Sequence, residues 1–156
     1  MMRCTLATMN RAIGGYAIAF ALLLALAARA AAPQDAIVGT WLTEDGGSTV
    51  EVSVSRASDG GSVYSGKVVW LKDPMRNGKP LVDAQNDDAT LRDRPILGLE
   101  ILSGFKANGA GAWTGGTLYS PRNGKRFPAD LSLLADGRLE VKVKAGIVTR
   151  TVNWTR

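Results

Sequence analysis

The chain has 156 residues, with nineteen basic and fourteen acidic side chains, one cysteine and no histidine. The absence of histidine excludes imidazole general-base catalysis, and a single cysteine excludes an intrachain disulfide and a zinc site built from histidine and cysteine. The formal net charge of +5 forms no basic stripe, so a nucleic-acid backbone is not an expected partner.

The first thirty residues predict a signal peptide. Arg3 and Arg11 supply a basic leader, residues 16–28 are an unbroken apolar run, and Ala28-Arg29-Ala30 places small residues where a signal peptidase reads. The alternative is an uncleaved membrane anchor, but the run is shorter than the roughly 20 residues that span a bilayer. We therefore expect residues 1–30 to be removed and the mature protein to be periplasmic or secreted.

Cleavage changes the chemistry that the chain can perform. Cys4 leaves with the leader, so the expected mature chain has neither thiol nor imidazole, which fits an oxidising compartment. Removal of the three leader arginines leaves sixteen basic against fourteen acidic residues, a nearly balanced charge. We expect residues 31–36 to be a short linker and residues 37–156 to form one domain with one core.

The expected mature region consists of short runs with alternating apolar and polar residues, the pattern of β-strands. Tyr64, Gly66, Val68 and Trp70, for example, share one face of the third run. Turn signals such as Pro-Arg-Asn-Gly at residues 121–124 separate the runs. The predicted strands span residues 38–43, 49–55, 62–72, 95–106, 112–119, 126–134, 138–144 and 147–156. Hairpin-length connections between most of them predict an all-β antiparallel meander that closes into a barrel or sandwich.

One connection, residues 73–94, is too long for a hairpin. Loops of this length in a small domain are usually binding loops or lids. Asn77-Gly78 predicts a small excursion within it, and residues 87–92 predict one helical turn with Asn86 or Asp87 as its cap.

Several motifs of this region resemble the DUF2147 family, secreted bacterial proteins of unknown function. They are Asp83-Ala-Gln-Asn86, residues 91–99, residues 113–125 and the closing Thr151-Val-Asn-Trp-Thr-Arg156. The resemblance covers nearly all of the expected mature chain. It implies a single eight-stranded antiparallel lipocalin-like (calycin-type) barrel exported to the periplasm, and it implies no established activity and no agreed catalytic residues.

The first and last predicted strands carry the residues expected to close the barrel, namely Gly39, Trp41, Trp154 and Arg156. In lipocalin-like barrels a tryptophan of a Gly-x-Trp motif plugs one end and a late arginine covers it, so the resemblance implies a cation–π contact between Trp41 and Arg156. The alternative is that Trp41 is ordinary core and Arg156 lies at a frayed terminus.

The long connection is also the best candidate for a polar site. Asp83, Asn86 and Arg94 are assigned to the mouth of a ligand site, and the neighbouring aspartates raise the possibility of a hard cation. The spacing does not match an EF-hand, so no metal site is assigned. The alternative is that Asp83, Asn86 and Arg94 pin the loop to the barrel.

Aromatic residues are candidates for the interior. Trp70, Trp113 and Tyr119 are assigned to the lining of a cavity for a partly apolar ligand. An eight-stranded barrel has room either for one small molecule or for a packed core, so these side chains have packed core as their alternative role.

These observations favour an exported, non-enzymatic binding protein for a small, partly apolar molecule. It is expected to use no cofactor, to bind no nucleic acid and to have no stable membrane insertion after cleavage. The alternative is a structural or protein-interaction module of the cell envelope with a filled barrel. An enzyme that uses a pair of carboxylates is the third possibility.

Overall fold

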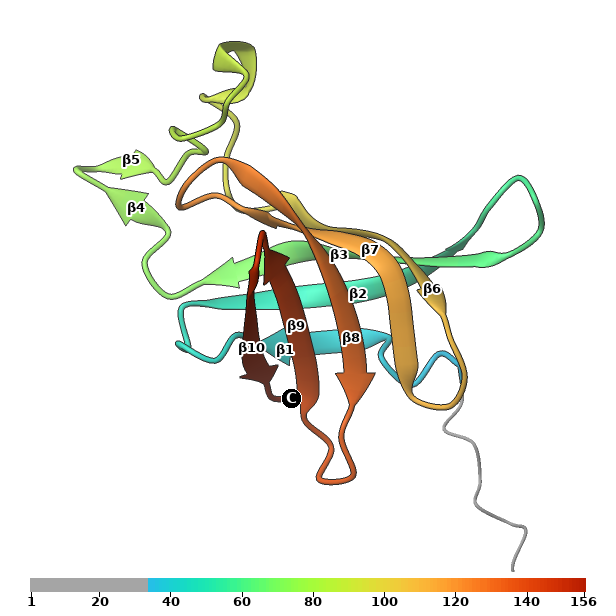
Figure 1. The fold of residues 1–156 in the computed structure, drawn as a ribbon. Coiled ribbons are helices and arrows are strands. Elements are labelled where there is room, and N and C mark those ends of the chain that lie inside the picture. The colour runs from blue at the N-terminus through green and yellow to red at the C-terminus, as the bar shows by residue number, and fades with distance from the viewer. Residues whose placement is uncertain (1–33) are drawn as a thin grey trace, which may run out of the picture. The chain divides into compact units, whose positions relative to one another are not determined.

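The computed structural model describes residues 34–156, so the predicted signal peptide lies outside the described residues. Eight antiparallel strands form one sheet in the order β1-β2-β3-β6-β7-β8-β9-β10, in which strands adjacent in the chain are also neighbours apart from the excursion between β3 and β6 (Figure 1). The strands are β1 (Gly39–Leu42), β2 (Ser48–Arg56), β3 (Ser62–Leu71), β6 (Glu100–Ala107), β7 (Ala112–Ser120), β8 (Lys125–Leu133), β9 (Leu139–Ala145) and β10 (Val148–Trp154). The predicted all-β meander is confirmed.

Two small elements lie between β3 and β6. The strands β4 (Met75–Arg76) and β5 (Lys79–Pro80) form a separate two-stranded sheet, and a 3₁₀ turn, η1, spans Ala89–Leu91. No helix among residues 34–156 is long and apolar enough to cross a membrane.

The sheet curls until its first and last strands meet. Leu42 and Thr155 form an antiparallel bridge, with N···O distances of 2.6 and 3.0 Å for its two hydrogen bonds. Beyond this bridge β1 ends, and the N–H of Asn153 donates instead to the carboxylate of Glu44 at 3.2 Å. We call the junction between β1 and β10 the seam. It consists of a short backbone contact and one side-chain hydrogen bond.

The prediction that Trp70 faces the interior is wrong. Tyr64, Gly66 and Val68 of β3 are buried as their alternation predicts, but a bulge follows them. Val68 is opposite Val50 and Trp70 is opposite Thr49, so Val69 is an extra residue. One extra residue exchanges the two faces of a strand. Trp70 is therefore 47% exposed on the outer face.

The fourth predicted strand also begins later than its pattern indicates. Residues 95–99 form a turn in which the N–H of Leu99 donates to the carbonyl of Ile96 at 3.0 Å, and β6 starts at Glu100. Gly98 allows this turn because its φ of 86° is in the left-handed region. Ile96 and Leu99 are nevertheless buried, so their apolar character reflects burial rather than a strand.

The segment before β1 closes one end of the barrel. The indole N–H groups of Trp113 and Trp41 donate to the carbonyls of Gln34 at 3.1 Å and Ile37 at 2.8 Å. The Tyr64 hydroxyl donates to Asp35 at 2.8 Å. Residues 34–36, expected to be linker, thus pack against the barrel because buried indole and phenol groups need hydrogen-bond partners.

Arg156 adds a second layer to this closed end. Its guanidinium lies 4.5 Å from the ring centroid of Trp41 and donates to the carbonyls of Ala36 at 2.6 Å and Val38 at 3.3 Å. Gly39 lies directly beside the guanidinium, and its φ of 126° is a backbone conformation that favours glycine.

The barrel interior next to the closed end is filled by side chains. Tyr64 and Trp113 meet edge to face with ring centroids 6.1 Å apart, and both are almost fully buried. Other side chains with at most 1% exposure in this core are Ile37, Trp41, Phe105, Leu102, Leu131, Leu139, Val50, Val52 and Val141. Trp113, a predicted lining residue, is therefore part of the packed core.

We expect Arg156→Ala to lower the free energy of unfolding by about 1–2 kcal/mol, because it removes the cation–π contact and two hydrogen bonds to carbonyls. Denaturant titration measures this change. Arg56→Ala is the matched control, because Arg56 is exposed at the end of β2. Equal stability of the two variants would show that the contact with Trp41 does not hold the end closed.

Candidate functional site

The long connection leaves the barrel at the end of β3 and returns at β6, so it lies at the end opposite the closed one. We call this end the mouth. Asn77 and Gly78, with φ angles of 51° and 74°, make the turn between β4 and β5, as their dipeptide predicts. The cap of η1 is Asp88, whose carboxylate accepts from the N–H of Thr90 at 2.9 Å, rather than Asn86 or Asp87.

The centre of this connection is the buried carboxylate of Asp83. Its side chain has no exposed surface, and it receives donors from Arg94, Asn86 and Tyr119. Arg94 donates through Nε at 3.0 Å and through one terminal nitrogen at 2.9 Å, both to the same carboxylate oxygen. The Asn86 amide donates to that oxygen at 2.7 Å, and the Tyr119 hydroxyl lies 2.7 Å from both oxygens.

These partners explain why the charge of Asp83 can be buried. An ionised carboxylate without partners in the interior is strongly unfavourable, and a pair with a guanidinium and further donors offsets that cost. Burial raises the pKa of Tyr119, and its hydrogen bond to the Asp83 carboxylate adds to the effect. Tyr119 therefore keeps its proton at neutral pH and acts as a donor.

Backbone contacts fix the same segment from both sides. The N–H of Asp83 donates to the Arg94 carbonyl at 3.0 Å, and the N–H of Ile96 donates to the Leu81 carbonyl at 2.9 Å. On the other side, a Cβ at Gly124 in the β7–β8 turn would lie 1.8 Å from the Gln85 carbonyl oxygen. Only glycine allows this approach, so the segment is a fixed wall rather than a free lid.

An open cavity of about 530 Å³ lies between this wall and the barrel rim. Apolar side chains form much of its lining, including Val68, Leu71, Leu81, Val82, Ile96 and Ile101. Charged and polar side chains also line it, including Asp45, Asp73, Arg76, Gln85 and Arg122. This combination of an apolar surface with a few polar groups is typical of sites for small organic molecules.

One ion pair joins two turns at this cavity. Arg122 of the β7–β8 turn pairs with Asp45 of the β1–β2 turn. The Asp45 carboxylate also accepts from the N–H of Gly47 at 3.0 Å and the Thr43 hydroxyl at 2.8 Å. These two hydrogen bonds and the charge of Arg122 lower the pKa of Asp45. Asp45 is therefore ionised at neutral pH, and its carboxylate already accepts hydrogen bonds from within the protein.

The structure gathers four of the six predicted ligand-binding residues but places them behind the cavity. Asp83, Asn86, Arg94 and Tyr119 form one cluster, and none of them lines the cavity. Their neighbours in the wall, residues 82, 84 and 85, do line it. The cluster therefore positions the wall, which for Asp83, Asn86 and Arg94 is the alternative role that the sequence leaves open.

The remaining two predicted residues, Trp113 and Trp70, lie in the packed core and on the outer surface. The lining residues Leu71, Ile101 and Arg122 were not identified from the sequence. All three lie beside a turn or connection at the mouth. This shared position can be recognised only once the strand order is known.

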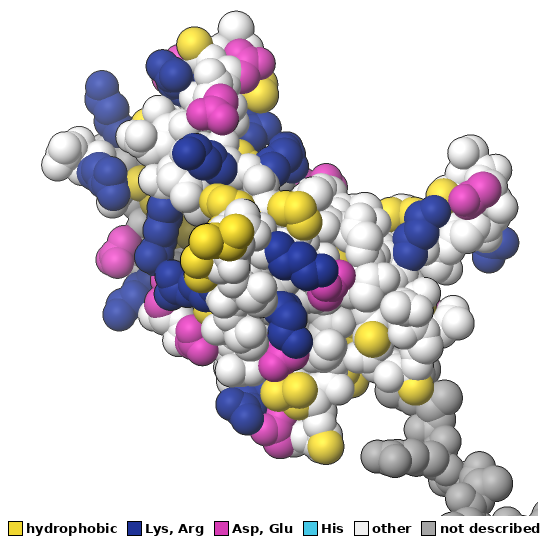
Figure 2. Space-filling view, viewed as in Figure 1, with side chains coloured by type: hydrophobic (Ala, Val, Ile, Leu, Met, Phe, Trp, Pro, Cys, Tyr) yellow, Lys and Arg dark blue, Asp and Glu magenta, His cyan; other side chains and the backbone are white. Residues whose placement is uncertain are grey.

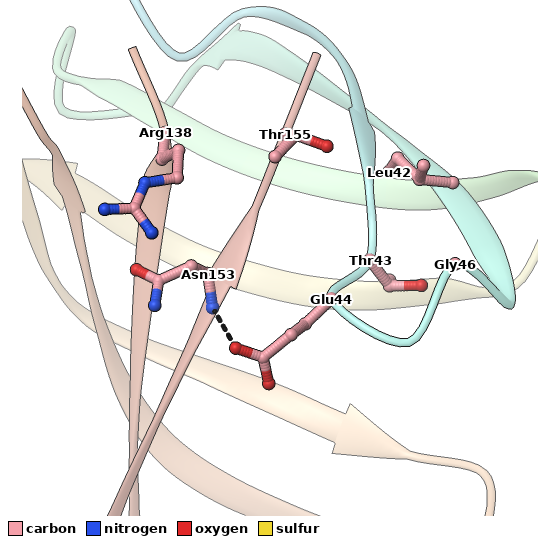
Figure 3. Close-up of a pocket in the computed structure, with 7 residues that line it drawn as sticks. All are labelled: Leu42, Thr43, Glu44, Gly46, Arg138, Asn153 and Thr155. Carbon is pink, nitrogen blue, oxygen red and sulfur yellow. Dashed lines mark hydrogen bonds between the residues drawn. The ribbon is translucent and has the colours of Figure 1, made fainter. Parts of the chain in front are cut away.

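A second, smaller pocket of about 280 Å³ lies at the seam (Figure 3). Glu44 reaches from the turn after β1 toward β10 and accepts from the N–H of Asn153. Arg138, which also lines this pocket, is paired with Asp136 at 2.7 Å. Because these charged groups already have partners, we interpret this pocket as a feature of the seam.

No group of three or more metal-ligating side chains comes together in the part of the chain that the structure describes.

The family model of an uncharacterized protein conserved in bacteria, DUF2147, matches residues 39–156. The chain belongs to the DUF2147 family. The solved structure described as protein HP1028 from the human pathogen Helicobacter pylori, belonging to the lipocalin family, is similar to this member, with a TM-score of 0.62 and 21% identity. The likeness covers 77% of this chain and 82% of that chain. At this identity it shows the fold alone. No curated protein matches the chain.

In this DUF2147 chain we expect Asp83→Asn to lower the free energy of unfolding by about 2–3 kcal/mol, because it removes the buried charge that pairs with the half-buried Arg94 and leaves donors unsatisfied. Denaturant titration measures the loss. Asp87→Asn serves as the control, since Asp87 is an exposed acid of the same loop, and its effect should stay within about 0.5 kcal/mol. A similarly small effect of Asp83→Asn would rule out a structural role for the buried carboxylate.

Proposed function

We propose that this chain is an exported, non-enzymatic binding protein that holds a small, partly apolar molecule in the cavity at its mouth. The supporting observation is the cavity itself, which has about 530 Å³ of space, apolar lining and charged residues. Sites for small organic molecules commonly have volumes of roughly 300–1,000 Å³ and this composition.

The fold agrees with this proposal. Barrels of eight strands, lipocalins among them, have room for one small ligand. Here Tyr64, Phe105 and Trp113 fill one half of the barrel, so the space for a ligand lies at the mouth. The loop wall forms one side of this cavity. The ligand would therefore contact Leu71, Ile96 and the loop wall instead of the predicted tryptophans.

The site chemistry supports binding over catalysis. Residues 34–156 contain no histidine and no cysteine, which leaves carboxylates as the acid–base groups closest to the cavity. Two carboxylates line the cavity, Asp45 and Asp73. Asp45 has a lowered pKa and is held by Arg122, so it is a poor general acid or base at neutral pH. Asp83 is enclosed by its own donors and does not line the cavity. The proposal invokes no cofactor.

Export is part of the proposal and rests on the leader-like residues 1–30. The intact mass of the protein recovered from the periplasm of a producing bacterium tests it. A mass that corresponds to a chain starting at residue 31, 32 or 33 would agree with export and cleavage. A full-length mass in the cytoplasmic fraction would contradict it.

Ala84→Trp tests the cavity as a binding site. Ala84 is exposed and lines the cavity, so a tryptophan there occupies space without disturbing the core. We expect the affinity for the apolar fluorescent probe anilinonaphthalene sulfonate to fall about tenfold or more, the factor that corresponds to 1.4 kcal/mol. Fluorescence titration measures this affinity.

Ala110→Trp is the matched control, because Ala110 is exposed in the β6–β7 turn at the closed end. It should bind the probe like the wild type. Native mass spectrometry of the exported protein is the companion measurement, since a co-purifying small molecule would identify the ligand class. If the wild type bound no probe and carried no molecule, the alternative of a filled interaction module would be favoured.

A further inference from the structure

The β9–β10 hairpin carries an exposed apolar tip. Residues 144–151 are all exposed, Ile147 in the turn is fully exposed, and Val148 at the start of β10 is 61% exposed. This exposure arises because β1 ends near Leu42, so the first half of β10 has β9 as its sheet neighbour on one side and none on the other. Figure 2 shows hydrophobic side chains at the surface over this turn, with Lys and Arg side chains around them.

The part of the hairpin nearest this tip carries only basic charged side chains. Residues 141–156 contain four basic side chains and no acid. Lys144 is opposite Thr149 and Arg150 is opposite Val143, so the two basic side chains lie three residues on either side of Ile147 and on opposite faces of the hairpin. Lys144 pairs with Asp130 of β8 at 2.7 Å and Lys142 pairs with Glu140 at 3.5 Å, whereas Arg150 forms no ion pair with any residue that the structure describes.

Other exposed apolar side chains lie at the same end of the barrel. β3, β7 and β9 end at the mouth, so the β9–β10 turn lies at the end where the cavity opens. Apart from Val54, every exposed large hydrophobic side chain of residues 34–156 belongs to a segment at this end. These are Leu42, Val69, Trp70, Met75, Leu91, Leu97, Ile147 and Val148. Single exposed apolar residues are ordinary, but their concentration at one end marks an interaction surface.

We infer that the β9–β10 tip docks reversibly on an anionic lipid surface. Ile147 and Val148 enter the boundary between head groups and acyl chains, and Arg150 contacts the lipid phosphates. Apolar side chains flanked by cations are the pattern of peripheral binding to anionic membranes. Two apolar side chains bury little area, so the docking is reversible. This inference is independent of the proposed cavity ligand, although docking would turn the cavity toward the lipid.

Vesicle co-sedimentation tests the inference. The protein is the exported form recovered from cells, with its intact mass measured, because a retained apolar leader would bind lipid by itself. Vesicles of pure phosphatidylcholine are compared with vesicles of equal parts phosphatidylcholine and phosphatidylglycerol. The wild type should bind the anionic vesicles, and added salt should weaken this binding because it screens the phosphates.

Two substitutions locate the contact on the hairpin. Ile147→Ser should lower the partition coefficient about tenfold, because it removes an apolar side chain that the bilayer would bury. Arg150→Gln should lower it about fivefold, the factor expected for one basic residue at an anionic surface, and Arg150→Lys should restore it. Val54→Ser and Arg56→Gln are the matched controls, since both residues are exposed on the part of β2 far from the mouth.

Thermal unfolding verifies that each variant folds, which is expected because the changed side chains are exposed. Loss of binding in the two hairpin variants but not in the controls would support the inference. Absence of binding by the wild type, or equal binding by all variants, would overturn it. A wild-type dimer that Ile147→Ser dissociates would also overturn it, because the tip would then contact a second copy of the chain.

Discussion

The buried carboxylate of Asp83 is the interaction on which the mouth of this barrel depends. It takes donors from Arg94, Asn86 and Tyr119, and so joins both halves of the long connection to strand β7. A connection of this length would normally be the most mobile part of a small domain. Because its central acid is buried with a full set of partners, the segment becomes a wall of the cavity, and the shape of that wall is set within the protein.

The two ends of the barrel use opposite arrangements. At the closed end, backbone carbonyls of residues 34–38 accept from Trp41, Trp113 and Arg156, and an aromatic core fills the space. At the mouth, the polar partners are internal to the wall, and apolar side chains such as Leu71 and Ile101 are left facing a cavity. One end is therefore filled and contributes to stability, and the other leaves an open cavity.

Strand order and most strand positions follow from the sequence, because period-two alternation and glycine turns are local signals. The inward direction of Trp70 does not follow, since a bulge depends on how β3 pairs with β2. The strand predicted from residue 95 fails for a related reason, because Ile96 and Leu99 are buried by tertiary packing and not by strand alternation. An apolar pattern predicts that a residue is buried more reliably than it predicts whether that residue belongs to a strand or a turn.

The candidate site could also be predicted only in part from the sequence. The polar residues of the long connection were identified because Asp83, Asn86 and Arg94 occur in a recognisable motif. The sequence does not determine their role, since it does not say whether a carboxylate faces a ligand or the interior. The lining residues cannot be read from the sequence, because segments distant in the chain bring Ile101 and Arg122 to the same cavity.

Hydrogen exchange of individual backbone amides tests the fixed wall most directly. The account predicts that the amides of Asp83 and Ile96, which donate to Arg94 and Leu81, exchange slowly, like those of strand β6. Exchange of these two amides as fast as that of the exposed turn at Asn77 would show that the connection opens freely. That result would contradict a preformed cavity at the mouth.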